Sequence, residues 1–169
     1  MRIPNAAHEA HPWVIAEIAP DFKLLDAWTL PVHGGPDGFD SFLEVMASFD
    51  PAKAESTASR AMSPVISGAL QRAAGGFIPL YRTDEEWAAE LSNGTVHGVL
   101  HLAWVQQGRG RYRAQMAVYV KPRGRLGETY MMLIQPFRHL IVYPALMRQI
   151  GHAWDARGRA GTGRDPQRK

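Results

Sequence analysis

Two neighbouring segments alternate between apolar and polar positions and predict a pair of β-strands. Residues 95–106 read TVHGVLHLAWVQ, and residues 111–121 read RYRAQMAVYVK. The even-numbered positions of both segments are apolar, and a period of two is typical of a strand with one buried face. The sequence QGRG between them predicts a hairpin turn.

The two apolar faces lie on the same side of the sheet only if the paired residue numbers add up to an even total. A slip of one residue would move every side chain of one strand to the opposite face. A three-residue loop at 108–110 gives the required register. The odd-numbered positions then meet on the other, more polar face, where His97, Val99, His101 and Ala103 lie with Arg113, Gln115, Tyr119 and Lys121.

The rest of the pattern predicts two more strands and several helices. The strands are expected at 22–32 and 77–83. In DEEWAAEL, residues 84–91, Thr83 followed by Glu86 has the spacing of a capping box and predicts a helix. The other helices are expected at 8–19, from 39 to about 50, at 52–74 and, with kinks at Pro136 and Pro144, at 126–156.

These elements predict an α+β fold. The apolar stripe of the C-terminal helix and the even face of the hairpin must both be buried, and packing them on each other is the economical solution. We expect a curved antiparallel sheet wrapped around a long C-terminal helix, with shorter helices between the first strands. A length of 169 residues fits one domain, and we place it at 1–156.

Residues 157–169 predict a disordered basic tail. They hold five Lys or Arg side chains and one Asp, so residues 1–156 carry a net charge of −1 although the whole chain carries +3. A folded nucleic-acid reader should carry its basic patch on the domain itself. We therefore expect no nucleic-acid partner for the domain.

Composition limits the kinds of site and the cellular location that we expect. The chain has no cysteine, which excludes disulfides, thiolate metal sites and a cysteine nucleophile and fits a reducing cytoplasm. The first residues contain no apolar signal region, and no segment approaches the ~18 apolar residues of a membrane helix. We expect a cytoplasmic protein without a membrane partner.

Several long blocks resemble a known family when they are read in order. They are PNAAHEAHPW, PDFKLLDAW, YRTDEEWAAELSN, TVHGVLHLAWV, YRAQMAVYVKPRG and YMMLIQPFRHLIVYPALMRQIGHAW. Together they are similar to the domain-of-unknown-function family 2867 over about residues 3–156. That family resembles the helix-grip, START-like (Bet v 1-like, SRPBCC) proteins, which implies a sheet around a C-terminal helix and often a hydrophobic ligand cavity. The segment 60–76 is shorter than the family pattern, which leaves open whether such a cavity is open or closed.

Two histidines on the polar face raise the question of a metal. Four residues of strand span ~13 Å, so His97 and His101 cannot both bind one zinc ion. Either both are ordinary residues of the polar face, or His101 enters a pocket or a partner interface. His8 and His11 lack a third ligand, so we expect no metal and no cofactor.

Other polar groups lie in apolar or cationic segments. In PFRHLIVYP, His139 and Tyr143 are four apart on a predicted helix and would form a proton-transfer pair, or else are structural. Lys121, Arg123 and Arg125 precede that helix and would bind an anion, or else form a solvated turn. Asp26 is a lone internal carboxylate beside Trp28.

These features favour binding of a mainly hydrophobic small molecule between sheet and helix, with cofactor-free acid–base chemistry such as cyclisation, dehydration or isomerisation. The expected catalytic residues are His101, His139 and Tyr143. The expected ligand-binding residues are Asp26, Trp28, Trp104, Met116, Tyr119, Phe137 and Arg138. The alternative is a non-catalytic interaction module, whose partner would be another protein or a second copy of the chain.

Overall fold

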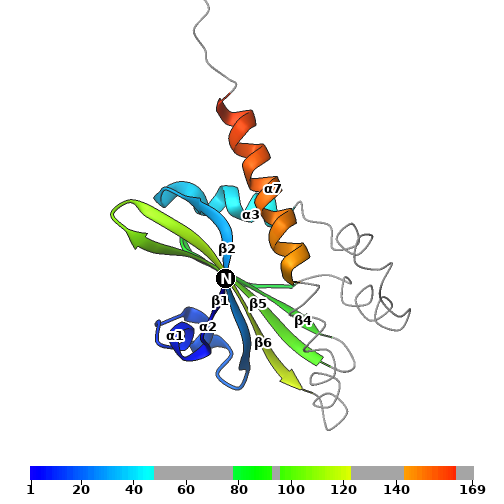
Figure 1. Ribbon diagram of the computed structural model, residues 1–169. Coiled ribbons are helices and arrows are strands. Elements are labelled where there is room, and N and C mark those ends of the chain that lie inside the picture. Colours follow the sequence, from blue (N-terminus) through cyan, green and yellow to red (C-terminus); the bar gives the residue numbers. More distant parts are fainter. Residues whose placement is uncertain (48–77, 93–95, 123–142, 163–169) are drawn as a thin grey trace, which may run out of the picture.

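An antiparallel sheet forms the centre of the molecule (Figure 1). The computed structural model describes residues 1–47, 78–92, 96–122 and 143–162. The strands in these ranges are β1 (Arg2–Ile3), β2 (Lys23–Gly34), β3 (Ile78–Arg82), β4 (Glu86–Ser92), β5 (Val96–Gly108) and β6 (Arg111–Pro122). Their order across the sheet is β1-β2-β6-β5-β4-β3, so the first long strand pairs with the last.

Helices cover both faces of this sheet. The described helices are α1 (Asn5–Glu9), α2 (Val14–Ile18), the 3₁₀ turn η1 (Pro36–Gly38), α3 (Phe39–Ala47) and α7 (Tyr143–Thr162). In Figure 1, α3 and α7 lie on one side of the sheet, and α1 and α2 lie on the other. The predicted α+β class, with a curved antiparallel sheet and a C-terminal helix, is confirmed.

The β5–β6 hairpin has the predicted register. Leu102 pairs with Met116 and His101 pairs with Ala117, so the paired numbers have an even total. The turn is one residue tighter than predicted, because Gly108 still pairs with Arg111 after an irregularity in the ladder. Gly110 has a φ of 66°, a left-handed conformation that glycine adopts without steric strain.

The even face of the hairpin packs against α7, as predicted, and also against α3. The indole of Trp104 stacks on Phe42 with ring centroids 6.0 Å apart, and Ile150 of α7 is fully buried in the same cluster. The other buried members of this cluster are Leu30, Val32, Phe39, Leu102, Ala114 and Met116. Burial of such side chains stabilises the fold by roughly 1.5–3 kcal/mol each.

The glycine-rich loop after β2 is shaped to receive Trp104. The indole N–H of Trp104 donates a hydrogen bond to the carbonyl oxygen of Gly35 at 2.9 Å. A Cβ atom at Gly38 would lie 2.5 Å from Cζ2 of Trp104, and one at Gly34 would lie 3.3 Å away. Close packing against Trp104 therefore explains the glycines at positions 34 and 38.

The predicted helix at 84–91 is wrong, because Glu86–Ser92 forms strand β4. The hydroxyl oxygen of Thr83 does accept hydrogen bonds from the N–H groups of Glu85 and Glu86, at 3.3 and 2.9 Å. Those bonds close a turn instead of capping a helix. Pairing with β3 on one side and β5 on the other then outweighs the local helical preference.

The single helix predicted at 8–19 is also wrong, since Pro12 and Trp13 separate α1 from α2. Helix α7 ends at Thr162, so the predicted domain boundary after residue 156 falls inside a helix. The predicted elements at 52–74 and 126–142, and residues 163–169 of the predicted tail, lie outside the described residues. Among the described helices, none is both long and apolar enough to cross a membrane.

Candidate functional site

Each strand of the sheet sends alternate side chains to two different faces, and this separates the predicted site residues. We call the face covered by α3 and α7 the helix-side face and the one covered by α1 and α2 the N-terminal face. Trp28, Trp104 and Met116 belong to the helix-side face. His101 and Tyr119 belong to the N-terminal face. The predicted ligand-binding residues therefore cannot all line one cavity.

A row of paired residues crosses the helix-side face. Trp87 pairs with Leu102, Leu102 with Met116, Met116 with Trp28, and Trp28 with Arg2. Trp28 and Trp87 are only partly buried, whereas Met116 and Leu102 belong to the core. This row thus places two partly buried tryptophans on either side of a packed core.

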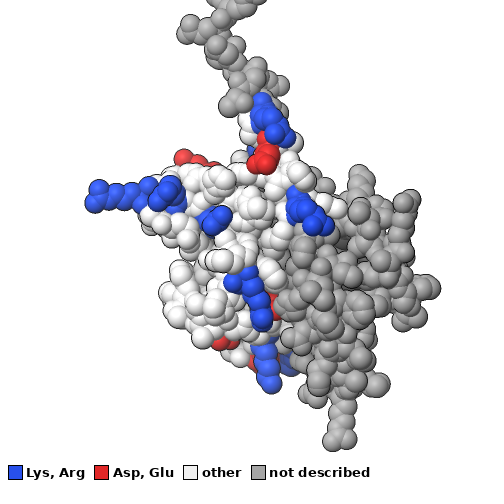
Figure 2. All heavy atoms as spheres, viewed as in Figure 1, with Lys and Arg blue, Asp and Glu red and all other residues white. Residues whose placement is uncertain are grey.

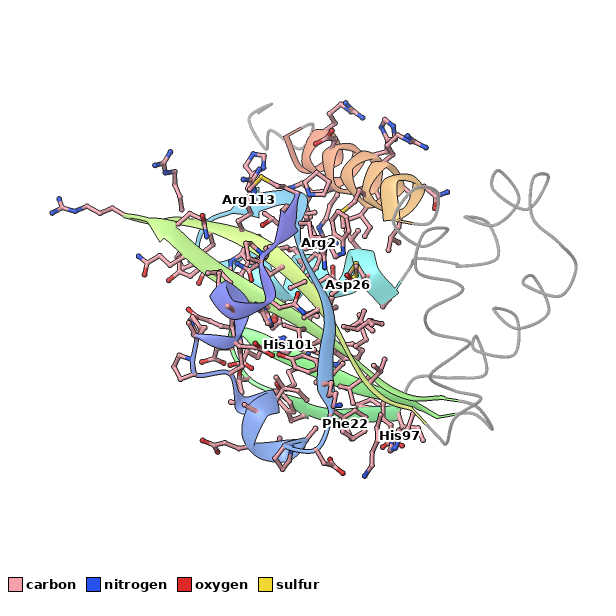
Figure 3. All side chains as sticks on the ribbon, turned by 60° about the horizontal axis from the view of Figure 1, so that its bottom comes forward. Arg2, Phe22, Asp26, His97, His101 and Arg113 are labelled. Carbon is pink, nitrogen blue, oxygen red and sulfur yellow. The ribbon has the colours of Figure 1, made fainter. Side chains whose placement is uncertain are left out.

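Asp26 lies on the same face, one step along the strands. It pairs with Val118, which pairs in turn with the partly buried Leu100. The Asp26 side chain is 1% exposed, and its Oδ1 is 3.5 Å from the guanidinium of Arg2 (Figure 3). A buried carboxylate is retained in proteins where it is paired, and here its partner is half exposed.

Further along this side, a shallow open depression of about 300 Å³ lies between β2 and α7. It is lined by Pro31, Met147, Arg148, Gly151, His152 and Asp155. The layer between the sheet and α7 is filled at this end by Trp104, Phe42 and Ile150. In the row described above, the partly buried side chains are those of Trp28 and Trp87, with Leu102 and Met116 buried between them.

The N-terminal face holds a polar cluster that consists of His8, Tyr81, Glu86, His101 and Tyr119. Its centre is the carboxylate of Glu86, whose Oε2 accepts three hydrogen bonds. The donors are Nε2–H of His101 at 3.1 Å, the hydroxyl of Tyr81 at 3.0 Å and the backbone N–H of Val14 at 3.2 Å. The imidazole of His101 is completely buried (Figure 3).

Hydrogen bonding keeps Glu86 ionised. Burial raises the pKa of this carboxyl, but the hydrogen bonds from His101, Tyr81 and Val14 outweigh burial and leave the pKa below its usual value. Burial, together with the charge of Glu86, raises the pKa of Tyr81 well above its ordinary value. Tyr81 therefore stays a protonated donor to an ionised acceptor.

His8 and Tyr119 form the second half of the cluster. Nε2 of His8 is 3.1 Å from the Tyr119 hydroxyl oxygen. Burial, and then the electrostatic interaction with His101, lower the pKa of His8 from 6.5 to about 4. Burial likewise raises the pKa of Tyr119, so both groups are neutral near pH 7.

Residues 5–19, which we call the N-terminal cover, close this cluster from solvent. The ring of Trp13 stacks on His8 at 5.0 Å and on His11 at 3.8 Å, and it meets His101 edge-on at 5.1 Å. Its indole N–H donates to the carbonyl oxygen of His8 at 2.7 Å. The cover thus supplies His8 and the Val14 N–H to a cluster whose other members lie on strands.

The remaining predicted residues are placed elsewhere or lie outside the described residues. The ammonium group of Lys121 forms an ion pair with Asp21. His97 lies 2.6 Å from a carboxylate oxygen of Glu90 and meets the ring of Phe22 edge-on. The predicted site residues that lie outside the described side chains are Arg123, Arg125, Phe137, Arg138, His139 and Tyr143.

The described residues offer little to a metal ion or to a polyanion. Among the described residues, no group of three or more His, Asp or Glu side chains is arranged to hold a metal ion. On the face seen in Figure 2, lysine and arginine side chains are scattered among uncharged residues and do not gather in one patch.

Sequence reasoning missed Glu86, Tyr81 and His8 as members of one site. The helix predicted at 84–91 contains Glu86. In a helix, its side chain could not face His101 across a β-ladder. The signal that could have found it is the alternation in EWAAEL, where Glu86 and Glu90 are on one face and Trp87 is on the other.

Comparison with known proteins identifies a family. The family model described as "Protein of unknown function (DUF2867)" matches residues 53–145, more than half of the 169 residues. The matched part contains Glu86, His101 and Tyr119, whereas the N-terminal cover lies before it. No curated protein and no solved structure matches the chain.

Proposed function

The chain belongs to the DUF2867 family, and we propose that it binds a mainly apolar small molecule on the helix-side face of its sheet. The observation that carries the proposal is the row that ends in Trp28 and Arg2, with buried Asp26 beside it. Ligand sites combine predominantly apolar and aromatic walls with a few placed polar groups. Trp28 supplies the aromatic surface, and the Asp26–Arg2 pair supplies the polar group.

The finer proposal is that the domain is helix-grip, START-like. Its support is topological: β2 pairs with β6, and the C-terminal helix α7 packs on the face that carries Trp28 and Met116. In that architecture a ligand occupies the space between sheet and helix. The description of the family supplies no activity, so the likeness bears on where a ligand would bind and not on which ligand it is.

The role of His101 in this proposal has to change. A strand directs neighbouring side chains to opposite faces, so His101 cannot touch a ligand that lies against Leu100, Leu102 and Met116. The proposal for the helix-side face is therefore binding. Cofactor-free acid–base chemistry on that face would rest on Asp26, or on His139 and Tyr143. The side chains of His139 and Tyr143 lie outside the described residues.

A second candidate function is a non-catalytic interaction module or homo-oligomer. It is favoured by the edge strand β3, where the large apolar side chain of Ile78 is 63% exposed. An exposed strand edge can pair with a strand of another chain.

The experiment that tests the main proposal is native mass spectrometry of the intact chain, followed by titration with the apolar fluorophore anilinonaphthalene sulfonate. The expected result is a co-purifying small molecule or saturable binding of the fluorophore. Trp28→Leu should weaken that binding by about fivefold, because an aromatic contact is worth on the order of 1 kcal/mol.

The matched control is Ile78→Thr, which removes an apolar side chain from the far edge of the sheet and should leave binding unchanged. Equal binding by wild type and Trp28→Leu would contradict the proposed location. A clean apo mass without fluorophore binding would contradict ligand binding itself. A concentration-dependent dimer that Ile78→Thr abolishes would favour the interaction module.

A further inference from the structure

The polar cluster contains a buried acceptor that nothing in the described residues satisfies. Nδ1 of His101 has no hydrogen-bond partner there, although its ring is 0% exposed. Because the ionised carboxylate of Glu86 can only accept, Nε2 of His101 carries a proton, and in the tautomer protonated at Nε2 alone Nδ1 presents a lone pair. A buried polar atom without a partner is rare in native proteins and calls for an explanation.

The charge around this atom selects the kind of group that could satisfy it. The carboxylate of Glu86 is adjacent, and the charges of Glu9 and Glu86 both raise the pKa of Tyr119. An anion would be repelled by these carboxylates. A neutral O–H or N–H group would instead donate to Nδ1 without adding charge.

The shape of the site is given by the side chain that fills it. Trp13 places a flat aromatic ring between His8 and His11, with its edge toward His101. Its only donor is used by the carbonyl oxygen of His8 and does not reach His101. Trp13 therefore matches the site in shape and leaves the lone pair of His101 unused.

The cover that carries Trp13 consists of short elements, and it is anchored to the sheet by the buried side chains of Trp13, Ile15 and Ala19 and by a few hydrogen bonds. Helices α1 and α2 have five residues each, and β1 has two. The side-chain hydrogen bonds that tie the cover to the rest of the chain include Asn5 to the carbonyl oxygen of Leu24, at 3.2 Å, and Val14 N–H to Glu86. Helices this short are not stable by themselves, so opening of the cover would break these contacts while the strand ladders of the sheet stay intact.

We propose that the polar cluster is a second binding site, which takes a flat, neutral aromatic molecule with an O–H or N–H group, and that Trp13 occupies it until such a molecule enters. The ligand ring replaces the indole between His8 and His11, and its donor group binds Nδ1 of His101. This site is on the opposite face of the sheet from Trp28 and does not depend on the function proposed above.

The test is isothermal titration of the full chain near neutral pH with naphthol, its methyl ether and naphthoate. These probes share one ring system and differ in donor and charge. Naphthol should bind about tenfold more tightly than either analogue, the effect of one hydrogen bond to a buried acceptor. In His101→Phe, which keeps an aromatic ring but has no acceptor, the ratio should fall to about one.

Gly35→Ala is the control, because the added atom meets nothing within 4 Å and should leave the ratio unchanged. A direct readout in the wild type, which does not depend on any variant folding, is the nitrogen NMR resonance of His101 Nδ1. That resonance should shift with naphthol and not with the ether.

Equal binding of the three probes, a preference that survives in His101→Phe, or no binding of any probe would overturn the proposal. If binding is lost in Trp28→Leu and kept in His101→Phe, the probe lies on the helix-side face. That result would overturn the second site while supporting the function proposed above.

Discussion

The two faces of one sheet are buried in opposite ways. The helix-side face is closed by α3 and by the twenty-residue helix α7, over a core of aromatic and aliphatic side chains. The N-terminal face is closed by two five-residue helices over a cluster of histidine, tyrosine and glutamate. Burial of the first face depends on the volume and shape of its side chains. Burial of the second depends also on which of its polar groups carry protons.

This difference teaches that burial alone does not indicate what a residue does for the fold. Trp104 and His101 are both essentially inaccessible to solvent and lie three residues apart on β5. Replacing the first changes packing at every pH. Replacing the second changes hydrogen bonds whose strength depends on pH and on the partner group.

The largest expected effect is on the helix-side face. Trp104→Ala should destabilise the fold by about 3–5 kcal/mol, because it opens a cavity among side chains that cannot collapse into it. Urea unfolding followed by circular dichroism measures this loss. The loss of stability should be the same at pH 5 and pH 8. A strong pH dependence would contradict the proposed difference between the two faces.

The next effect belongs to the N-terminal face and appears only in acid. The pKa of His8 is lowered to about 4 in the folded chain, so unfolding takes up a proton below its ordinary pKa of 6.5. Stability should therefore be complete above pH 6.5, fall on acidification toward pH 4 and level off below it. The loss is on the order of 3 kcal/mol.

Thermal unfolding of wild type and His8→Gln across this pH range isolates the contribution of His8. The variant should be less stable at pH 7 and flatter between pH 6.5 and 4. Parallel curves for the two proteins would mean that His8 is not the group that titrates.

A third prediction concerns the carboxylate at the centre of the cluster. Glu86→Gln should cost about 2 kcal/mol, because the neutral amide is a weaker acceptor for the donors of His101, Tyr81 and Val14. Hydrogen exchange of the Val14 amide should speed up more than exchange in β5.

The matched control is Glu90→Gln, on the same strand and the same face. Its partner His97 is 25% exposed, so the change should stay within about 1 kcal/mol. Equal losses for the two variants would show that the burial of Glu86 has no special effect.

The smallest expected loss of stability comes from adding a single methyl group on the helix-side face. In Gly38→Ala the new Cβ would lie 2.5 Å from Trp104, so either the loop that contains residue 38 or the indole ring must move. We expect a loss of about 1–2 kcal/mol. That corresponds to a melting temperature lower by roughly 2–8 °C for a domain of this size. Gly35→Ala, where the added atom meets nothing within 4 Å, is the control.

The sequence predicted the fold best where local pattern and tertiary packing agree. The alternation in 95–106 and 111–121 predicted the register of β5 and β6 and the face that α7 covers. It did not predict β4, because Thr83 and Glu86 have the same spacing in a capping box and in the observed turn. Only pairing with β5 distinguishes the two.

The candidate site was harder to predict because its members are far apart in the chain. His8 and Tyr119 are separated by 111 positions, and only the folding of the N-terminal cover onto the sheet brings them together. Alternation did indicate that His101 and Tyr119 share a face. It could not indicate that Trp13 would cover them, because the contact involves no repeat, motif or spacing.

The pairing of β2 with β6 has a consequence for how the chain is made. Lys23 pairs with Val120, and Leu24 pairs with Tyr119, so β2 has its main partner only after most of the chain has left the ribosome. Until then the apolar residues of β2 lack both strand β6 and helix α7, which follows β6 in the chain. Contacts this distant in sequence slow folding. During synthesis, the exposed strand is therefore the segment for which chaperones and aggregation would compete.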